Sequence, residues 1–221
     1  MPRLEWDKTS ERFYETGVSN GVLYPFSAET NKYETGVAWN GLTAVNENPT
    51  GGEKTAIYAD NIKYLNLVSK EDFGCTIEAY QSPKEFDACD GSAEVATGVY
   101  IAQQKRKNFG FVYKSLYGND TEETDYGYIL HIVYGCNANP SQKSRSTVNE
   151  TPEAMTLSWE VSTIPVEVEG YKPTAHLQIK SWLTDATKLA EIEDKLFGSE
   201  NDDPTLLLPD EVIDIINSTN P

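Results

Sequence analysis

Few residues of this chain are of a type and spacing that could do chemistry. Its two histidines, His131 and His176, both lie in strand-like runs, on the face opposite the main apolar stripe. A metal site built from them needs further ligands that the spacing along the chain does not supply. We therefore expect ordinary strand histidines that face neighbouring side chains or solvent, with no metal ion and no cofactor.

The carboxylates do not indicate an enzyme either. With 35 acidic residues, some pair must resemble a glycosidase dyad by chance, so such a pair carries no information. The chain has no P-loop, no dinucleotide-binding glycine motif, no nucleophile elbow and no HExxH. The acidic run Asn119–Asp125 is similar in composition to a calcium loop but lacks its spacing, so we expect a solvated loop.

The charge balance disfavours nucleic-acid binding. A formal charge of −17 repels phosphate, whereas proteins that grip nucleic acid do so with lysine and arginine. The acidic residues concentrate after Thr184, and a basic cluster lies at Lys105–Lys107. Such segregated opposite charges suit head-to-tail association with copies of the same chain, although a solvated acidic face is the simpler interpretation.

Alternation of apolar and polar residues is the dominant pattern and predicts a mainly β fold, a β-sandwich or incomplete barrel. The run Tyr126–Tyr134 is almost wholly apolar or aromatic, so it predicts a central strand covered on both faces. Further strand-like runs are Val37–Val45, Ile57–Leu67, Cys75–Tyr80, Phe109–Lys114, Met155–Ser162 and Ala175–Lys180.

Turn chemistry predicts two hairpins. Ser19-Asn20-Gly21 lies between two apolar runs, and Asn-Gly readily accepts positive φ. A polar segment rich in proline and glycine predicts a long mobile hairpin loop, which is the candidate assembly site. Its residues are Asn46, Glu47, Asn48, Pro49, Thr50, Gly51, Gly52, Glu53 and Lys54.

Helical spacing occurs near the C-terminus. Apolar residues every three or four positions predict an amphipathic helix over Thr184–Phe197, with Gly198 after its last turn. A short helix is expected around Pro83–Ala88. Residues 1–198 are thus expected to form one domain with its flanking helix, and residues 199–221 an acidic C-terminal arm. The arm's apolar residues 206–216 would fold back on their own domain or dock on a neighbouring copy.

Compartment and core residues follow from composition. The three cysteines have no CxxC or metal-like spacing, and Cys75 fits a small core residue. The start of the chain lacks the apolar core of a signal peptide, and no stretch approaches the roughly 20 apolar residues that span a bilayer. We therefore expect synthesis in the cytoplasm and no membrane contact.

Trp159 fits the core, whereas the position of Trp6 and Trp39 stays open.

Several segments in order resemble the major tail (tail-tube) proteins of long-tailed, non-contractile bacteriophages of Gram-positive hosts. The resemblance extends from about residue 10 to residue 216, and the ordered set carries it rather than any single piece. The matching segments are Ile57–Leu65, Phe73–Tyr80, Pro83–Phe86, Cys89–Gly91, Gln103–Phe111, Tyr126–Cys136, Pro152–Glu160, Gly170–Pro173 and Leu207–Val212.

The resemblance implies a β-sandwich or incomplete barrel with a flanking helix, a long hairpin loop and terminal arms. It further implies homo-hexameric rings that stack into a hollow tube, through whose lumen phage DNA is ejected without specific binding. By the same resemblance the partners are the tape measure, tail terminator and distal tail proteins, and the location is the virion after synthesis in the host cytoplasm. Residues 46–54 and the acidic C-terminal arm would then contact the next ring.

Two other classes of protein remain open. A carbohydrate- or receptor-binding β-sandwich would show exposed tryptophans clustered on one sheet face. An enzyme acting on glycans or peptidoglycan would require turnover that depends on one carboxylate.

Overall fold

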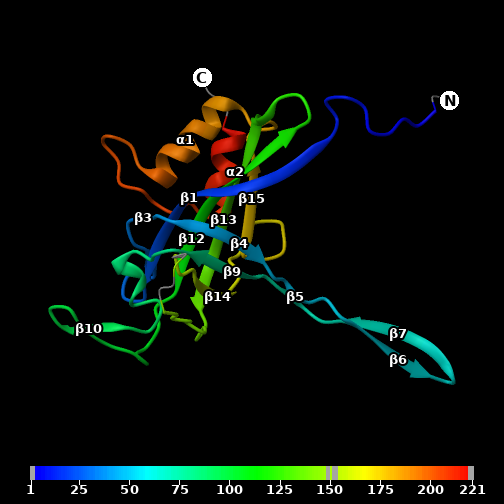
Figure 1. Ribbon diagram of the computed structural model, residues 1–221. Coiled ribbons are helices and arrows are strands. Elements are labelled where there is room, and N and C mark those ends of the chain that lie inside the picture. Colours follow the sequence, from blue (N-terminus) through cyan, green and yellow to red (C-terminus); the bar gives the residue numbers. More distant parts are fainter. Residues whose placement is uncertain (1–2, 148–149, 151–153, 219–221) are drawn as a thin grey trace.

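The computed structural model describes residues 3–147, 150 and 154–218. Within them the fold is mainly β, as predicted, with one large antiparallel sheet and two helices (Figure 1). The strands of this sheet are β1 (Phe13–Ser27), β2 (Lys32–Tyr33), β3 (Val37–Trp39), β4 (Leu42–Glu47), β9 (Gly74–Ala79), β12 (Phe109–Asn119), β13 (Glu123–Ala138), β14 (Leu157–Thr163) and β15 (His176–Lys180).

The sheet is curled and does not close. Its strands follow the order β2-β1-β12-β13-β14-β9-β4, while β15 pairs with β13 and β3 pairs with β1. The last strand in this order, β4, nevertheless lies close to β1 near the other edge of the sheet. The contact that shows this is the side chain of Leu42 on β4, which packs directly over Gly21 on β1. The result is an incomplete barrel.

Alternation along the strands divides the buried side chains into two cores. On β12, Phe111 and Tyr113 belong to the inner core inside the curl, whereas Val112 faces the helices. The inner core also holds Trp159 and Trp39, which settles the open position of Trp39. The helix-side core lies between the outer face of the sheet and the C-terminal segment.

Strand β13 is covered on both faces, as its nearly unbroken apolar sequence predicts. Leu130, Ile132 and Tyr134 belong to the helix-side core, and Val133 belongs to the inner core. Every residue from Ile129 to Tyr134 is buried. This strand pairs with β12, β14 and β15, so it is the centre of the sheet.

The predicted amphipathic helix is present as α1 (Ala186–Phe197). Asp185 caps its start, since the carboxylate accepts hydrogen bonds from the backbone N–H groups of Thr187 and Lys188. Gly198 ends it with a positive φ of 82°. The expected short helix is a 3₁₀ turn, η1 (Lys84–Phe86).

The C-terminal segment folds back on its own domain. Leu206, Leu207 and Val212 are buried in the helix-side core, and α2 (Pro209–Asn217) packs beside α1. The hydroxyl of Tyr134 donates a hydrogen bond to the carbonyl of Leu207 at 3.0 Å, which joins this segment to the central strand. Of the two arrangements left open by the sequence, the described residues adopt the folded-back one.

The hairpin predicted at Ser19-Asn20-Gly21 was wrong. The chain continues through these residues as the single strand β1, which pairs with β12 on both sides of them. Asn20 does take a positive φ of 53°, and the register with β12 shifts on each side of Ser19. Asn-Gly therefore bends the strand as a bulge instead of reversing it.

Two further hairpins project from the sheet. One contains β10 (Ala93–Ala96) and β11 (Val99–Ile101), which the sequence did not predict. The other is much longer and connects β4 to β9 (Figure 1). Its strands are β5 (Thr50–Gly51), β6 (Lys54–Ala59), β7 (Ile62–Val68) and β8 (Glu71–Asp72).

Candidate assembly surface and histidine cluster

The predicted assembly loop lies at the base of the long hairpin and not at its tip. Strand pairing continues beyond it to a turn at Asp60-Asn61, where both residues take a positive φ. The run Ile57–Leu67, expected as one strand, therefore folds into two. The predicted residues are divided among three strands and the links between them. Asn46 and Glu47 are the last residues of β4, Thr50 and Gly51 form β5, and Lys54 is the first residue of β6. Asn48 and Pro49 connect β4 to β5, and Gly52 and Glu53 connect β5 to β6.

Residues 50–72, here called the hairpin arm, extend away from the body of the protein (Figure 1). All seven residues of β7 are exposed, although most of them are apolar. Tyr58 is 70% and Tyr64 66% exposed. A ribbon of two strands is marginally stable in water, and exposed apolar side chains in such number are typical of surfaces that another protein covers.

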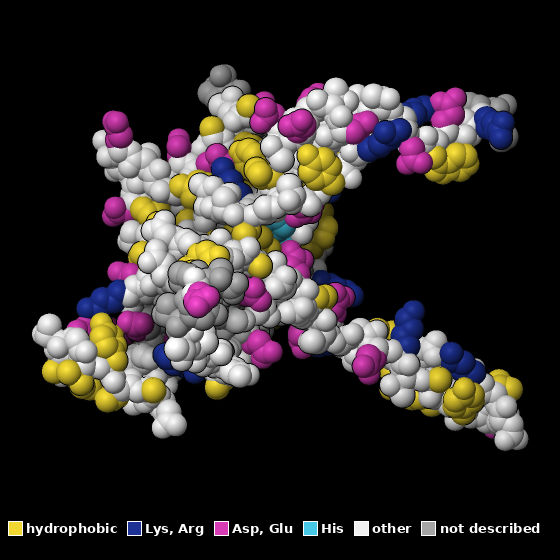
Figure 2. Space-filling view, viewed as in Figure 1, with side chains coloured by type: hydrophobic (Ala, Val, Ile, Leu, Met, Phe, Trp, Pro, Cys, Tyr) yellow, Lys and Arg dark blue, Asp and Glu magenta, His cyan; other side chains and the backbone are white. Residues whose placement is uncertain are grey.

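Other apolar side chains project from the same molecule. In the N-terminal segment, Leu4 and Trp6 are each about three-quarters exposed. In the hairpin formed by β10 and β11, Val95, Val99 and Tyr100 are exposed. Figure 2 shows these segments and the hairpin arm extending from the body in different directions, each with hydrophobic surface. Contacts with more than one neighbour would be needed to cover them all.

The outer part of the hairpin arm is slightly basic, although residues 50–72 as a whole carry three lysines against four acidic residues. This outer part, β6, β7 and the turn between them, carries Lys54 and Lys63 against Asp60 alone. The whole chain has a formal charge of −17. Figure 2 shows lysine and apolar side chains together on this arm. An acidic neighbour would therefore attract this outer part, and a second copy of this chain is such a neighbour.

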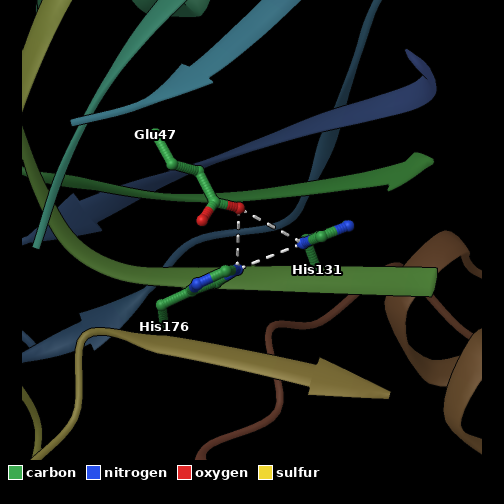
Figure 3. Close-up of side chains that lie close together, drawn as sticks. All are labelled: Glu47, His131 and His176. Carbon is green, nitrogen blue, oxygen red and sulfur yellow. Dashed lines mark hydrogen bonds and ion pairs between the residues drawn. The ribbon is translucent and has the colours of Figure 1, made fainter. Parts of the chain in front are cut away.

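At the base of the arm, Glu47 meets the two histidines (Figure 3). His131 on β13 and His176 on β15 are diagonal neighbours across two paired strands, with Nδ1 of His131 3.2 Å from Nε2 of His176. Oε1 of Glu47, at the end of β4, lies 3.7 Å from each of these nitrogens. Three strands of the curled sheet thus direct one ligand atom each to a common point.

Hydrogen bonds from neighbouring strands orient the cluster. The hydroxyl of Ser115 donates to Oε1 of Glu15 at 2.6 Å and lies 2.8 Å from Nε2 of His131. Because a serine hydroxyl has one proton, it must accept from His131, so Nε2 of His131 carries the ring proton. Nδ1, which faces His176, is then the atom with the free lone pair. The hydroxyl of Tyr113 donates to Oε1 of Glu47 at 3.1 Å.

Both imidazoles are neutral at neutral pH. Burial, and to a lesser extent the adjacent His176, lower the pKa of His131 to about 3. Burial also lowers the pKa of His176, against the opposing effect of Glu47. His131 is 2% exposed, and the ring of Tyr113 stacks on it with centroids 4.4 Å apart. The cluster therefore presents two neutral nitrogens and a carboxylate.

Solvent can reach the cluster through a cavity of about 410 Å³ lined by residues of β1, β4, β12 and β13. It is lined by Glu15, Glu47, Tyr113, Ser115 and His131, among others. Most of its lining residues are polar, unlike the apolar inner core beside it.

Sequence reasoning did not bring these three residues together. It placed both histidines correctly in strands, but the contact between them depends on the register of β13 with β15, in which His131 pairs with Gln178. Glu47 was expected in a mobile loop, whereas it ends β4 and pairs with Cys75. No spacing along the chain carries this information.

Comparison with models of known protein families finds no match for this chain, and a search of curated proteins finds no significant match. Within the described residues, neither helix is long and apolar enough to cross a membrane.

Proposed function

We propose that this protein is the structural subunit of a phage tail tube and assembles as stacked hexameric rings around a channel for DNA. The observation that supports this proposal best is the hairpin arm. It exposes Tyr58, Ile62, Tyr64 and Leu67 on a ribbon that extends far beyond the sheet. Such an arm buries its apolar surface if it docks on the next ring.

The ordered resemblance to tail-tube proteins supports the same function, and all but one of its segments lie outside or at the base of the arm. An incomplete barrel offers unpaired strand edges to neighbouring subunits, and edge pairing is a common way to extend a sheet between chains. A heterologous contact that closes would form the ring, and one that stays open would stack the rings. The acidic balance suits a lumen that repels DNA and leaves it free to slide. In the virion, the tape measure, tail terminator and distal tail proteins would be its further partners.

The structure gives less support to a carbohydrate-binding module. Trp39 and Trp159 are buried in the inner core. Trp182 stacks on Tyr117 with ring centroids 4.2 Å apart, so one of its faces is already covered. Exposed Trp6 lies in the N-terminal segment, away from the sheet faces. The tryptophans therefore do not form a shared sugar-binding face.

Electron microscopy of the concentrated, purified chain in negative stain tests the proposal. We expect hollow tubes or six-fold rings with a central channel. The double variant Ile62→Asp with Tyr64→Asp places two charges on one face of β7, since alternate residues share a face, and should abolish the assemblies. Circular dichroism should show an unchanged fold, because both positions are exposed.

Tyr171→Asp is the matched control, since Tyr171 is 78% exposed but lies outside the hairpin arm. This variant should assemble as the parent chain does. A parent chain that stays as single particles at high concentration would contradict self-assembly. Normal tubes from the β7 double variant would show that the arm makes no contact between rings.

A further inference from the structure

The three ligand atoms of the histidine cluster have the spacing of a metal site. The triangle formed by Nδ1 of His131, Nε2 of His176 and Oε1 of Glu47 has sides of 3.2, 3.7 and 3.7 Å. A point equidistant from these three atoms lies about 2 Å from each, which is the length of a bond from Zn²⁺ to imidazole nitrogen or carboxylate oxygen. A cation fits among them without movement of the backbone.

The hydrogen bonds around the cluster are those that a metal site needs. A histidine that binds a metal almost always donates its other ring N–H to a carboxylate, a carbonyl or water. Nε2 of His131 donates to Ser115, which in turn donates to Glu15, so Nδ1 keeps its lone pair for the cluster. Tyr113 uses one lone pair of the Glu47 oxygen, and a second lone pair is left for a cation.

The donor set selects the class of metal. Two neutral imidazoles and one carboxylate suit Zn²⁺ and similar divalent transition metals, whereas Mg²⁺ and Ca²⁺ prefer sites made wholly of oxygen. Glu47 keeps about a third of its side chain exposed, so water can add as a fourth ligand. Without a metal, the 3.2 Å contact between the histidines is a hydrogen bond donated by Nε2–H of His176, and binding requires the other tautomer of that ring.

We propose that Glu47, His131 and His176 bind one divalent transition-metal ion, Zn²⁺ in the first place, and that the ion fixes the base of the hairpin arm to the sheet. Glu47 is the last residue of β4, directly before the arm, while the histidines belong to the central part of the sheet. The ion therefore bridges two parts of the curl that are not directly paired with each other. This proposal does not depend on tube assembly, and the single chain tests it.

Titration of the metal-free full chain, without a histidine tag, tests the site. Co²⁺ is the spectroscopic probe, because a four-coordinate site of nitrogen and oxygen ligands gives intense visible absorption. We expect one equivalent of Co²⁺ to bind and Zn²⁺ to displace it. Glu47→Gln and His176→Gln should each weaken binding by at least about tenfold, the loss that even a supporting partner causes.

Glu53→Gln is the matched control for Glu47, since it removes a carboxylate of the arm outside the cluster, and it should bind Co²⁺ as the parent does. Far-UV circular dichroism establishes that each variant is folded. Both variant positions are less buried than His131, which makes loss of the fold less of a concern. A parent chain that binds Co²⁺ no more tightly than Glu47→Gln combined with His176→Gln would overturn the site.

Hydrogen exchange tests the effect on the arm. With Zn²⁺, the amides at its base should exchange more slowly, namely Asn48, which donates to the carbonyl of Gly74, and its neighbours on β4 and β9. The amides of the turn at Asp60-Asn61 should be unaffected. If the metal binds but the amides at the base exchange no more slowly, the metal site stands and its role in fixing the arm is wrong.

Discussion

The hydroxyl of Tyr113 on β12 donates a hydrogen bond to Oε1 of Glu47 at the end of β4, at 3.1 Å. These strands are not paired with each other, so the bond crosses the inside of the curled sheet. Burial first, and then the charge of Glu47, raise the pKa of this phenol far above its ordinary value, so it stays a donor at any pH at which the protein is handled. One hydrogen bond thus couples the base of the hairpin arm to the inner core.

Tyr113→Phe tests this coupling. The substitution removes the donor and keeps the ring that stacks on His131, so the free energy of unfolding should fall by about 1 kcal/mol. Chemical denaturation measures it. Tyr171→Phe, at an exposed position, should change stability by less than about 0.5 kcal/mol. Equal effects of the two changes would mean that the bond to Glu47 contributes nothing.

Stability should depend on pH through His131. Its pKa is about 3 in the folded protein against the ordinary 6.5, so between these values the unfolded chain binds a proton that the folded chain does not. The free energy of unfolding should therefore fall as the pH falls through this range, with the His131 contribution reduced by about 2 kcal/mol near pH 5. Urea denaturation at neutral pH and near pH 5 measures the loss. In His131→Gln the free energy of unfolding should fall less between neutral pH and pH 5, by about the His131 contribution. If the variant and the parent show the same pH dependence, the loss does not come from His131.

Packing of α1 on the sheet should dominate the stability of the helix-side core. Ile192 is fully buried, so Ile192→Ala removes contacts and leaves a cavity, which costs about 2–5 kcal/mol. The same change at Ile216 of α2, a residue 42% exposed, should cost much less. Thermal or chemical denaturation compares the two variants. Similar losses would show that α1 is not packed as described.

Gly135 should be intolerant of a side chain. It lies in β13 with a φ of 58°, and an added Cβ would stand 2.1 Å from the carbonyl oxygen of Ile164. Gly135→Ala should therefore combine backbone strain with a steric clash and lower the free energy of unfolding by several kcal/mol, more than the roughly 1–3 kcal/mol of strain alone. Gly170→Ala is the control, because its φ is also positive but no atom lies near the added carbon. Equal losses of unfolding free energy in the two variants would show that the contact with Ile164 does not destabilise Gly135→Ala.

The sequence determined those features that depend on neighbours along the chain. Alternation on β12 and β14 and the apolar run of β13 follow from which faces are covered, and this pattern is written locally. The same holds for α1, where the spacing of Leu189, Ile192 and Leu196, with Gly198 after the last turn, defines one amphipathic helix. These predictions were confirmed because each rests on a few consecutive residues.

Tertiary structure decided the features that depend on the register between strands. It also decided whether residues that favour a positive φ form a bulge within a strand or a turn between two strands. Asn20 and the pair Asp60-Asn61 all take a positive φ, yet Asn20 makes a bulge in β1 whereas Asp60-Asn61 reverses the arm. The difference is that β12 continues alongside β1 at Asn20, and no other described strand runs alongside the turn at Asp60-Asn61. The histidine cluster depends on the pairing of β13 with β15 and on the curl that brings Glu47 across the sheet. Contacts between residues up to 129 positions apart are set by how strands align, and no local pattern in the sequence encodes that alignment.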